Sequence, residues 1–479
     1  MSATPATRQE KDSIGTKDIP AHVYYGVQTA RAVENYPISG MMAHPTLIKA
    51  FGMVKLAAAE ANKELGLVDD KRADAIIAAA REVIDGKWNQ EFVVDVFQAG
   101  AGVSFHMNTN EVIANRATEI MGGKLGEYLA HPNDHVNYGQ STNDVFPTGM
   151  RLGALLELEK LYPALDSLAS ACEKKATEFH HVMKSGRTHM QDAVPLRLGQ
   201  EFAAYSASIR KATDGIRRGS ETLRELGLGG SAVGTGINTH PDYRNKAIAN
   251  LSKISGQKLT PAADMRWAMQ SNYAMSDVSA SLRNLALEII RISNDLRLLS
   301  SGPNTGFAEI NLPSLQPGSS IMPGKINPVM PELAAMVAFQ VVGNDMAVAL
   351  AVQGGQLELN VMMPTMSYSV MQSITILTNM IHVFTDKCIA GITANQQRCE
   401  FYAQSTVSLA TALNPYIGYA KAAEIVKESV ATGRSIIDIA REKKLLSEKE
   451  IAEILDPLNM TEPQRPLVST KELDKKTKH

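Results

Sequence analysis

The sequence has 479 residues, which is enough for two or three domains. Its composition, 44% hydrophobic and 20% charged, is that of a globular protein, and its formal net charge of -2 argues against nucleic acid or an anionic membrane as the main partner. With only 5% aromatic residues but 22 methionines, the sequence favours packed helices over sheets.

The N-terminal stretch MSATPATRQEKDS has no apolar core of the kind found in signal peptides. No uninterrupted apolar run approaches the roughly 18 residues of a membrane-spanning helix. Three cysteines (Cys172, Cys388 and Cys399) are too few and too scattered for a disulfide framework or a CxxC metal site. We therefore expect a soluble, cytoplasmic protein with reduced thiols.

The predicted elements begin after residues 1–45, which look irregular because prolines and glycines interrupt them. From Leu47 onward, apolar residues recur at spacings of three and four, which predicts helices. Loop signals return around residues 91–116 and 131–149. The predicted helices cover residues 47–65, 71–86, about 149–179 with an interruption at Pro163, 198–226, 275–299, 331–352 and 364–388.

Helices of this length in succession predict an all-α fold built around a long bundle. Several are apolar on more than one face, so we expect the surplus to be buried in a homo-oligomer. The last eighty residues are shorter, more charged amphipathic helices, and Ser447 with Glu450 forms a capping box. We predict three domains, over residues 1–142, 143–397 and 398–479.

Four polar segments, far apart in the sequence, could carry chemistry. The first is GAGVSFHMNTNEV, residues 100–112, whose glycines permit close backbone approach to a ligand and whose Ser104 and His106 are polar. A turn before a helix explains this segment equally well, and His106 on its own is interpreted as structural.

The second segment is GQSTND, residues 139–144. Ser141, Thr142 and Asn143 place three hydrogen-bonding side chains in consecutive positions, which suits a carboxylate at a helix N-terminus. These residue types are also good helix caps, and local sequence alone favours the cap.

The third segment is SGRTHMQDAVP, residues 185–195, which we expect to be a loop. Thr188 and His189 are adjacent, and a histidine can carry a proton or donate to an anion. The alternative is a structural histidine with satisfied hydrogen bonds.

The fourth segment is GSSIMPGKINPVMPE, residues 318–332, which prolines and glycines mark as an irregular, mobile loop. Lys325 could pair with a carboxylate, and Asn327 can donate or accept a hydrogen bond. A flexible surface loop would explain the prolines, but not the combination of Ser319 and Ser320 with these two residues.

Other catalytic signatures are missing from the sequence. The glycine-rich stretch GLGGSAVGTG, residues 227–236, does not follow a predicted strand, so we do not read it as a dinucleotide-binding loop. Neither HExxH nor EF-hand spacing occurs, so no metal site is predicted, and GxSxG is missing as well.

The segment GSSIMPGKINP resembles the signature loop GSSxMPxKxNP of the fumarase/aspartase superfamily. Counterparts to that superfamily follow in the same order over nearly the whole chain: YYGVQTARAVENYPI, NTNEVIANRA, HPNDHVN, QSTNDVFPT, GRTHMQDAVPLRLGQEF, AVGTGINTHP, NDLRLLSSGP, GNDMAVALAVQGGQLELNVM and TALNPYIGY. The resemblance implies an all-α fold of three domains and a homotetramer whose active sites each draw on three subunits. It also implies reversible anti elimination from a small dicarboxylate to give fumarate, without an organic cofactor.

The resemblance also implies roles for individual residues. Ser319 would be the general base, working as an alkoxide, which requires burial and hydrogen-bond donors that favour the anion. Loop backbone N–H groups and Lys325 could supply these once the loop closes. The implied binding roles are Ser141, Thr142 and Ser320 for the β-carboxylate, Thr188, Lys325 and Asn327 for the α-carboxylate, Asn143 and His189 for the leaving group, and Met322 for the pocket wall.

Members of the superfamily divide mainly between loss of ammonia from L-aspartate and loss of water from L-malate. EINLPSLQPGSS, GQLELNVM and KCIAGITANQQRCE resemble the aspartases, whereas GGSAVGTGINTHP resembles the fumarases; on balance we predict ammonia loss. A fumarase, a lyase acting on an N-substituted aspartate and an inactive helical scaffold are the alternatives.

Three positions depart from the superfamily pattern. Val103 stands where a threonine is usual, Met363 where a charged residue is usual, and Asn304-Thr305 where an arginine usually follows the proline. A lost pocket donor costs roughly 1–3 kcal/mol unless it is replaced. Ser104 or a water molecule could substitute for the missing threonine hydroxyl, or the preferred substrate differs slightly.

Overall fold

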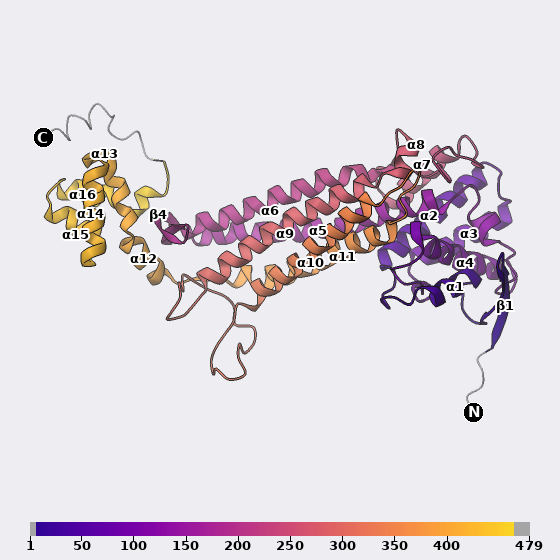
Figure 1. Ribbon diagram of the computed structural model, residues 1–479, viewed down its shortest axis with the longest axis horizontal. Coiled ribbons are helices and arrows are strands. Elements are labelled where there is room, and N and C mark those ends of the chain that lie inside the picture. The colour runs from indigo at the N-terminus through magenta and orange to yellow at the C-terminus, as the bar shows by residue number, and fades with distance from the viewer. Residues whose placement is uncertain (1–5, 464–479) are drawn as a thin grey trace. The chain divides into compact units, whose positions relative to one another are not determined.

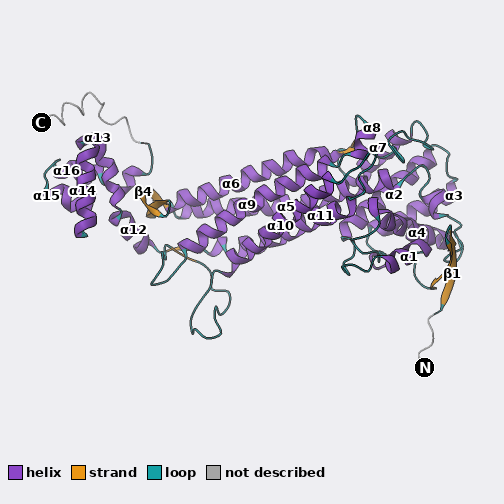
Figure 2. Ribbon diagram, viewed as in Figure 1, coloured by secondary structure: helices purple, strands orange, loops and turns teal. Residues whose placement is uncertain are grey.

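The computed structural model describes residues 6–463. Residues 1–5 and 464–479, at the outer ends of the first and third predicted domains, lie outside this range. Helices dominate the described chain, and the strands are short two-stranded pairs (Figure 2). The predicted all-α class is confirmed.

The α-helices are α1 (Val27–Asn35), α2 (Pro45–Glu64), α3 (Asp70–Ile84), α4 (Val103–Ile120), α5 (Thr142–Glu178), α6 (Leu198–Ser220), α7 (Tyr243–Ser255), α8 (Met265–Gln270), α9 (Tyr273–Leu299), α10 (Val329–Gln353), α11 (Met363–Lys387), α12 (Gln396–Ser405), α13 (Asn414–Ile417), α14 (Tyr419–Thr432), α15 (Ile436–Glu442) and α16 (Glu448–Ile454). The strand pairs are β1 (Thr7–Asp12) with β2 (Gly15–Pro20), β3 (Met183–Thr188) with β4 (Gln191–Arg197), β5 (Glu225–Leu226) with β6 (Thr260–Pro261), and β7 (Ile310–Asn311) with β8 (Thr393–Ala394).

The described chain forms two compact units, each made of several segments. The first runs to Pro163 and adds Ala212–Leu287 and Val337–Asn379, and the second comprises Ala164–Lys211, Glu288–Met336 and the described residues from Met380 onward. The division into three domains stays a prediction.

The core of the first unit forms where α2, α3 and α4 pack together (Figure 1). The alanine-rich α2 is buried over most of its length, because small side chains let neighbouring helices approach closely. Phe51 of α2 meets the rings of Phe105 and Phe146 edge to face, at 4.8 and 5.4 Å between ring centroids. These rings join α2, α4 and the start of α5.

The long helices pack side by side within each unit. In the first unit, the Ser279 hydroxyl of α9 donates to Asp345 of α10 at 2.7 Å. In the second, the Ser206 hydroxyl of α6 donates to Glu173 of α5 at 3.0 Å. The predicted long bundle helices α9, α10 and α11 match their observed limits within a few residues.

Several helix predictions need correction, among them the start of α5, which lies at Thr142 and not at about residue 149. Pro163 does not interrupt α5, because the flanking Leu161, Ala164 and Leu165 are fully buried and packing holds the helix through the missing N–H. Helix α6 ends at Ser220, six residues before the predicted limit, where a 3-10 turn leads into β5. Residues 1–45 are not uniformly irregular, since they contain the β1–β2 hairpin and α1.

In the second unit, the described part of the C-terminal region has its own apolar core. It is formed by residues from α14, α15 and α16, including Ile425, Ile439 and Ile451. The predicted capping box is confirmed, since Ser447 and Glu450 bond to each other's backbone N–H groups at the start of α16.

Candidate active site

The second polar segment lies at the N-terminus of α5, in the first unit. The backbone N–H of Asn143 donates to Ser141 Oγ at 3.2 Å, and that of Ser141 donates to Asp144 Oδ1 at 2.9 Å. Ser141 is therefore a helix cap, as local sequence indicates. The side-chain amide of Asn143 donates to the carbonyl of Ala232 at 2.8 Å, which turns this amide toward the glycine-rich stretch.

The carboxylate of Asp144 binds the glycine-rich stretch of residues 227–236. Its Oδ2 accepts the backbone N–H groups of Gly229 and Ser231, both at 3.0 Å, and the carboxylate is fully buried. Burial raises the pKa of Asp144 to about 6, while the three donated N–H groups oppose the rise. The stretch 227–236 is thus a structural support for the start of α5, consistent with its exclusion as a dinucleotide loop.

The first polar segment is a helix and not a loop from Val103 onward, so the loop prediction there is wrong. Helix α4 forms despite its asparagines and threonines because their side chains find partners elsewhere in the fold. The Asn108 amide, for example, donates to the carbonyl of Glu91 at 2.9 Å. Ser104 lies in the first turn of α4 and is largely buried, and the Gln98 side chain caps that turn by accepting from Phe105 N at 2.7 Å.

A buried lysine on α2 connects the first two segments. Lys55 Nζ lies 2.8 Å from His106 Nε2, 2.8 Å from Gln140 Oε1 and 3.0 Å from Asn137 Oδ1. The other ring nitrogen, His106 Nδ1, lies 2.6 Å from Thr142 Oγ1. Lys55 is not recognisable as a site residue from the sequence, because it lies among the apolar residues of a regular helix.

The third polar segment, predicted as a loop, is the β3–β4 hairpin of the second unit. Thr188 pairs with Gln191, so His189 and Met190 form a two-residue turn. Both have positive φ, +55° and +61°, as a type I′ turn requires. Because neither residue is a glycine, this turn holds strain, and it presents Thr188 and His189 to solvent.

Arg187 anchors this hairpin. Its guanidinium donates to Glu309 at 2.8 Å and lies over the rings of Phe307 at 4.2 Å and Tyr402 at 5.1 Å. The fully buried Glu309 also pairs with Lys184 of the same strand at 3.0 Å. The strained turn next to Arg187 therefore rests on a network of buried charges.

The fourth polar segment is a loop between β7 and α10, in the second unit, as predicted. Ser319 Oγ accepts two backbone N–H groups, from Met322 at 2.9 Å and from Ile321 at 3.2 Å. The Asn327 amide donates to the carbonyl of Gly318 at 2.6 Å, which closes the base of the loop. A Cβ atom on Gly318 would lie 2.4 Å from the Lys325 carbonyl oxygen, so only glycine fits there.

The predicted site residues fall into three local groups. Ser104 and residues 141–143 lie at the starts of α4 and α5 in the first unit, and Thr188 with His189 forms the hairpin tip. Residues 319–327 form the loop, on which Ser320, Met322 and Lys325 are exposed. Among residues 6–463 no cluster of three or more metal-ligating side chains occurs.

Two cavities lie within the first unit. A polar cavity of about 590 Å³ is lined by Val103 and Ser104 together with Arg31, His131 and Asn133, among others. Ser104 is thus the predicted binding residue that faces it, and the departure at Val103 lies on the same wall.

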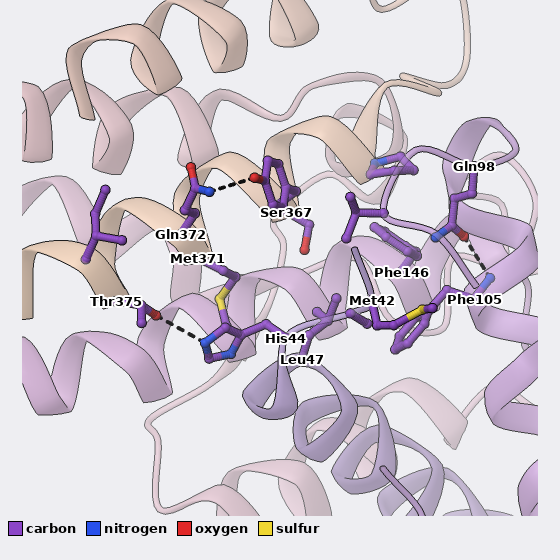
Figure 3. A pocket seen from close by; sticks show the side chains of 15 residues that line it. Met42, His44, Leu47, Gln98, Phe105, Phe146, Ser367, Met371, Gln372 and Thr375 are labelled. Atoms are coloured by element: carbon purple, nitrogen blue, oxygen red, sulfur yellow. Dashed lines mark hydrogen bonds between the residues drawn. The ribbon is translucent and has the colours of Figure 1, made fainter. Parts of the chain in front are cut away.

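The second cavity, of about 170 Å³, is lined mainly by apolar side chains such as Met42, Phe105 and Met371 (Figure 3). His44 reaches Thr375 Oγ1 at its edge, 3.1 Å away. None of the predicted site residues lines this cavity. Met363, the second departure, is buried at the first position of α11.

Comparison with known proteins gives a consistent result. Residues 15–343 match the family model described as "Lyase", and residues 409–462 match "Fumarase C C-terminus". The chain is 49% identical to the aspartate ammonia-lyase of Pseudomonas aeruginosa over 97% of this chain and 99% of that one. It is also 48% identical to the class II fumarate hydratase of Halobacterium salinarum, over 95% and 97%.

The fold matches that of solved structures in the same group. The crystal structure of fumarate lyase:delta crystallin from Brucella melitensis bound to cobalt superimposes with a TM-score of 0.93 at 46% identity, covering 96% of this chain and all of that one. Sequence, fold and signature loop agree, and the chain belongs to the lyase family that includes aspartases and class II fumarases.

Proposed function

We propose that this protein is an aspartate ammonia-lyase, which converts L-aspartate reversibly into fumarate and ammonia. The observation that carries the proposal is the environment of Ser319. Its oxygen already accepts two backbone N–H groups at 2.9 and 3.2 Å, in a loop that also bears Lys325 and Asn327. A hydroxyl in this setting has two donors in place for its anion.

In the proposed reaction, the Ser319 alkoxide takes a proton from the carbon next to the β-carboxylate. The electron pair left behind is delocalised into that carboxylate, which Ser141, Thr142 and Ser320 would bind. The C–N bond then breaks, the pair forms the double bond of fumarate, and ammonia leaves on the side of Asn143 and His189. Donors aimed at the developing charge are worth on the order of 10²–10³ in rate each.

A class II fumarase is the second candidate. The relative from Halobacterium salinarum supports it, because its 48% identity is almost the same as that of the aspartate ammonia-lyase from Pseudomonas aeruginosa at 49%. The resemblance of EINLPSLQPGSS and GQLELNVM to the aspartases ranks ammonia loss first. Overall identity does not separate the two reactions.

The test is to incubate purified protein with L-aspartate, L-malate or an N-substituted aspartate such as argininosuccinate and to follow fumarate by its ultraviolet absorbance. Fumarate from aspartate is expected. Fumarate from malate but not from aspartate would replace the proposal with the fumarase. Ser319→Ala should abolish turnover without changing the oligomer, whereas Ser314→Ala, on the same loop, should retain it; an active Ser319→Ala variant rules out the proposed base.

We also propose that the protein works as a homotetramer whose active sites are shared between subunits. Helix α10 supports this, because only 33% of its most apolar 18-residue stretch is buried in the single chain. Its exposed Met336, Phe339, Met346 and Leu350 lie along one stripe. The helix is long and apolar enough to span a membrane by length and composition alone, but packing against other copies in a bundle core would bury the same stripe.

Subunit complementation tests the shared site. If residues 141–143 and the loop of 319–327 come from different subunits, co-expression of Thr142→Val with Ser319→Ala in equal amounts restores some sites that carry neither change. Random assembly then gives about a quarter of wild-type activity. A mixture as inactive as its two components would show that each site uses both segments of one chain.

A further inference from the structure

We propose that His106, held by Lys55, is a positioning residue that turns the Thr142 hydroxyl into a hydrogen-bond donor for the substrate carboxylate. This inference rests on the proposed function, in which Thr142 binds the β-carboxylate. It assigns a role to two side chains that the proposed reaction does not otherwise use.

Lys55 has a hydrogen-bond partner for each of its three N–H bonds. Its Nζ is surrounded by three groups, at 2.8, 2.8 and 3.0 Å: His106 Nε2, Gln140 Oε1 and Asn137 Oδ1. The two amide oxygens are correctly assigned, because the Gln140 and Asn137 nitrogens donate to the backbone carbonyls of Val136 and Gln140. An ammonium group has three N–H bonds and no acceptor, so it satisfies all three partners.

The hydrogen bond from Lys55 determines the tautomer of His106. Because Lys55 donates to Nε2, that nitrogen has no proton, and the ring proton of the neutral imidazole lies on Nδ1. The neutral form is favoured, since burial and the charge of Lys55 hold the pKa of His106 well below its usual range. Burial holds the pKa of Lys55 well below its usual range too, against the charge of the buried Asp144; the ammonium form assigned here rests on the two amide oxygens and the ring nitrogen around Nζ.

The tautomer of His106 in turn sets the direction of its hydrogen bond with Thr142. With its proton on Nδ1, His106 donates to Thr142 Oγ1 at 2.6 Å. The hydroxyl proton of Thr142 then points away from the ring and can donate to an anion. If Thr142 instead donated to His106, it would present only lone pairs to the carboxylate, and the contact would be repulsive. Lys55 therefore determines the direction of a hydrogen bond that it does not itself make.

The test is a double-mutant cycle on kcat/KM for L-aspartate, using His106→Leu and Thr142→Val. Each single change should lower kcat/KM on the order of 10- to 100-fold, the loss of one hydrogen bond to a charged group. Because His106 acts through Thr142, the double variant should be no worse than Thr142→Val alone. A role in general stability would instead give effects that multiply.

Two conservative variants sharpen the cycle. His106→Asn places an amide N–H near the position of Nδ1 and should recover most of the loss, whereas His106→Gln places its amide near Nε2 and should not. All variants are first compared with wild type in far-UV circular dichroism and oligomer size. Multiplying effects, equal recovery by Gln, or an unchanged His106→Leu would each overturn the inference.

Binding separates this inference from the proposed function. Succinate is a dicarboxylate that cannot react. In calorimetry, His106→Leu and Thr142→Val should each bind it more weakly than wild type does, and by similar factors. If wild type binds succinate but makes no fumarate from aspartate, the proposed function fails, while the succinate cycle still decides the role of His106. If wild type does not bind succinate, both ideas fail.

Discussion

Replacing Gly102 by alanine tests whether the start of α4 is held by a steric constraint. Gly102 precedes the helix with φ +82° and ψ +26°, in the left-handed region. An added Cβ would lie 2.0 and 2.1 Å from two ring carbons of Phe146, where ordinary contacts are longer than 3.4 Å. Phe146 is buried between Phe51 and Phe105, so its ring has little room to move.

The cost of the change has two parts. Left-handed backbone costs an alanine roughly 1–2 kcal/mol, and overpacking a well-filled core typically adds about 1–3 kcal/mol. We expect Gly102→Ala to lower the free energy of unfolding by roughly 2–5 kcal/mol. Gly122→Ala is the matched control, because Gly122 has φ +88° but no atom within 4 Å of its added Cβ. Gly122→Ala should lower the free energy of unfolding only by the cost of left-handed backbone, roughly 1–2 kcal/mol.

Urea unfolding followed by far-UV circular dichroism measures both variants, at equal protein concentration because an oligomer's stability depends on it. Gly102→Ala should also lower kcat/KM, since Gly102 lies two residues before Ser104. Equal destabilisation by the two substitutions would show that the contact with Phe146 costs nothing, and the steric argument would then be wrong.

Three further predictions follow from buried groups. Arg187→Met removes the guanidinium that supports the strained His189 turn and should lower kcat/KM on the order of 10-fold. The control is Arg441→Met, at an exposed ion pair with Glu448, which should leave kcat/KM unchanged. Equal effects of the two substitutions on kcat/KM would refute the anchoring role of Arg187. Burial lowers the pKa of His44 below 6.5, against the opposing charge of Glu157, so the folded state binds fewer protons than the unfolded state. Stability is therefore fully present above pH 6.5 and declines as the pH falls below it. His44→Asn, which keeps a side-chain acceptor at the cap of α2, should remove this part of the decline in thermal midpoint. Burial raises the pKa of all three cysteines, Cys172, Cys388 and Cys399, to about 12. A thiol reagent at neutral pH should therefore label none of them in the native protein and all three after denaturation. A cysteine labelled in the native state would contradict this burial.

The long bundle helices were predictable because their apolar periodicity extends over about 25 residues, where no other structure competes. The start of α4 was not, since Asn108 and its polar neighbours lower local helix propensity. Their compensation comes from distant partners such as Glu91. The β3–β4 hairpin was missed for a related reason: its turn uses His189 and Met190 at positive φ, where Gly or Asn is the usual signal.

For the site, the sequence could predict the residues that bind the substrate only through the resemblance of their segments to a family. It could not identify the residues that hold them. Lys55 is 51 positions from His106, and Asp144 is 85 positions from Gly229. Lys55 looks locally like part of a regular helix and Asp144 like part of a helix cap, and only the tertiary contact shows what each one supports.

The residues that support the predicted site share one physical feature: each has a charged side chain that is buried away from water. Lys55, Asp144 and Glu309 are all fully buried. Lys55 and Asp144 each have three hydrogen-bond partners, and Glu309 has two ion pairs, with Lys184 and Arg187. Burying a charge is costly, and a broken buried pair is more costly still, so each support has one stable arrangement of partners. That arrangement is what orients Thr142, the cap of α5 and the His189 turn. A chain could keep the signature loop intact and yet lose catalysis through a single change at one of these buried positions, because orientation within about half an ångström is what makes a binding group useful to a reaction.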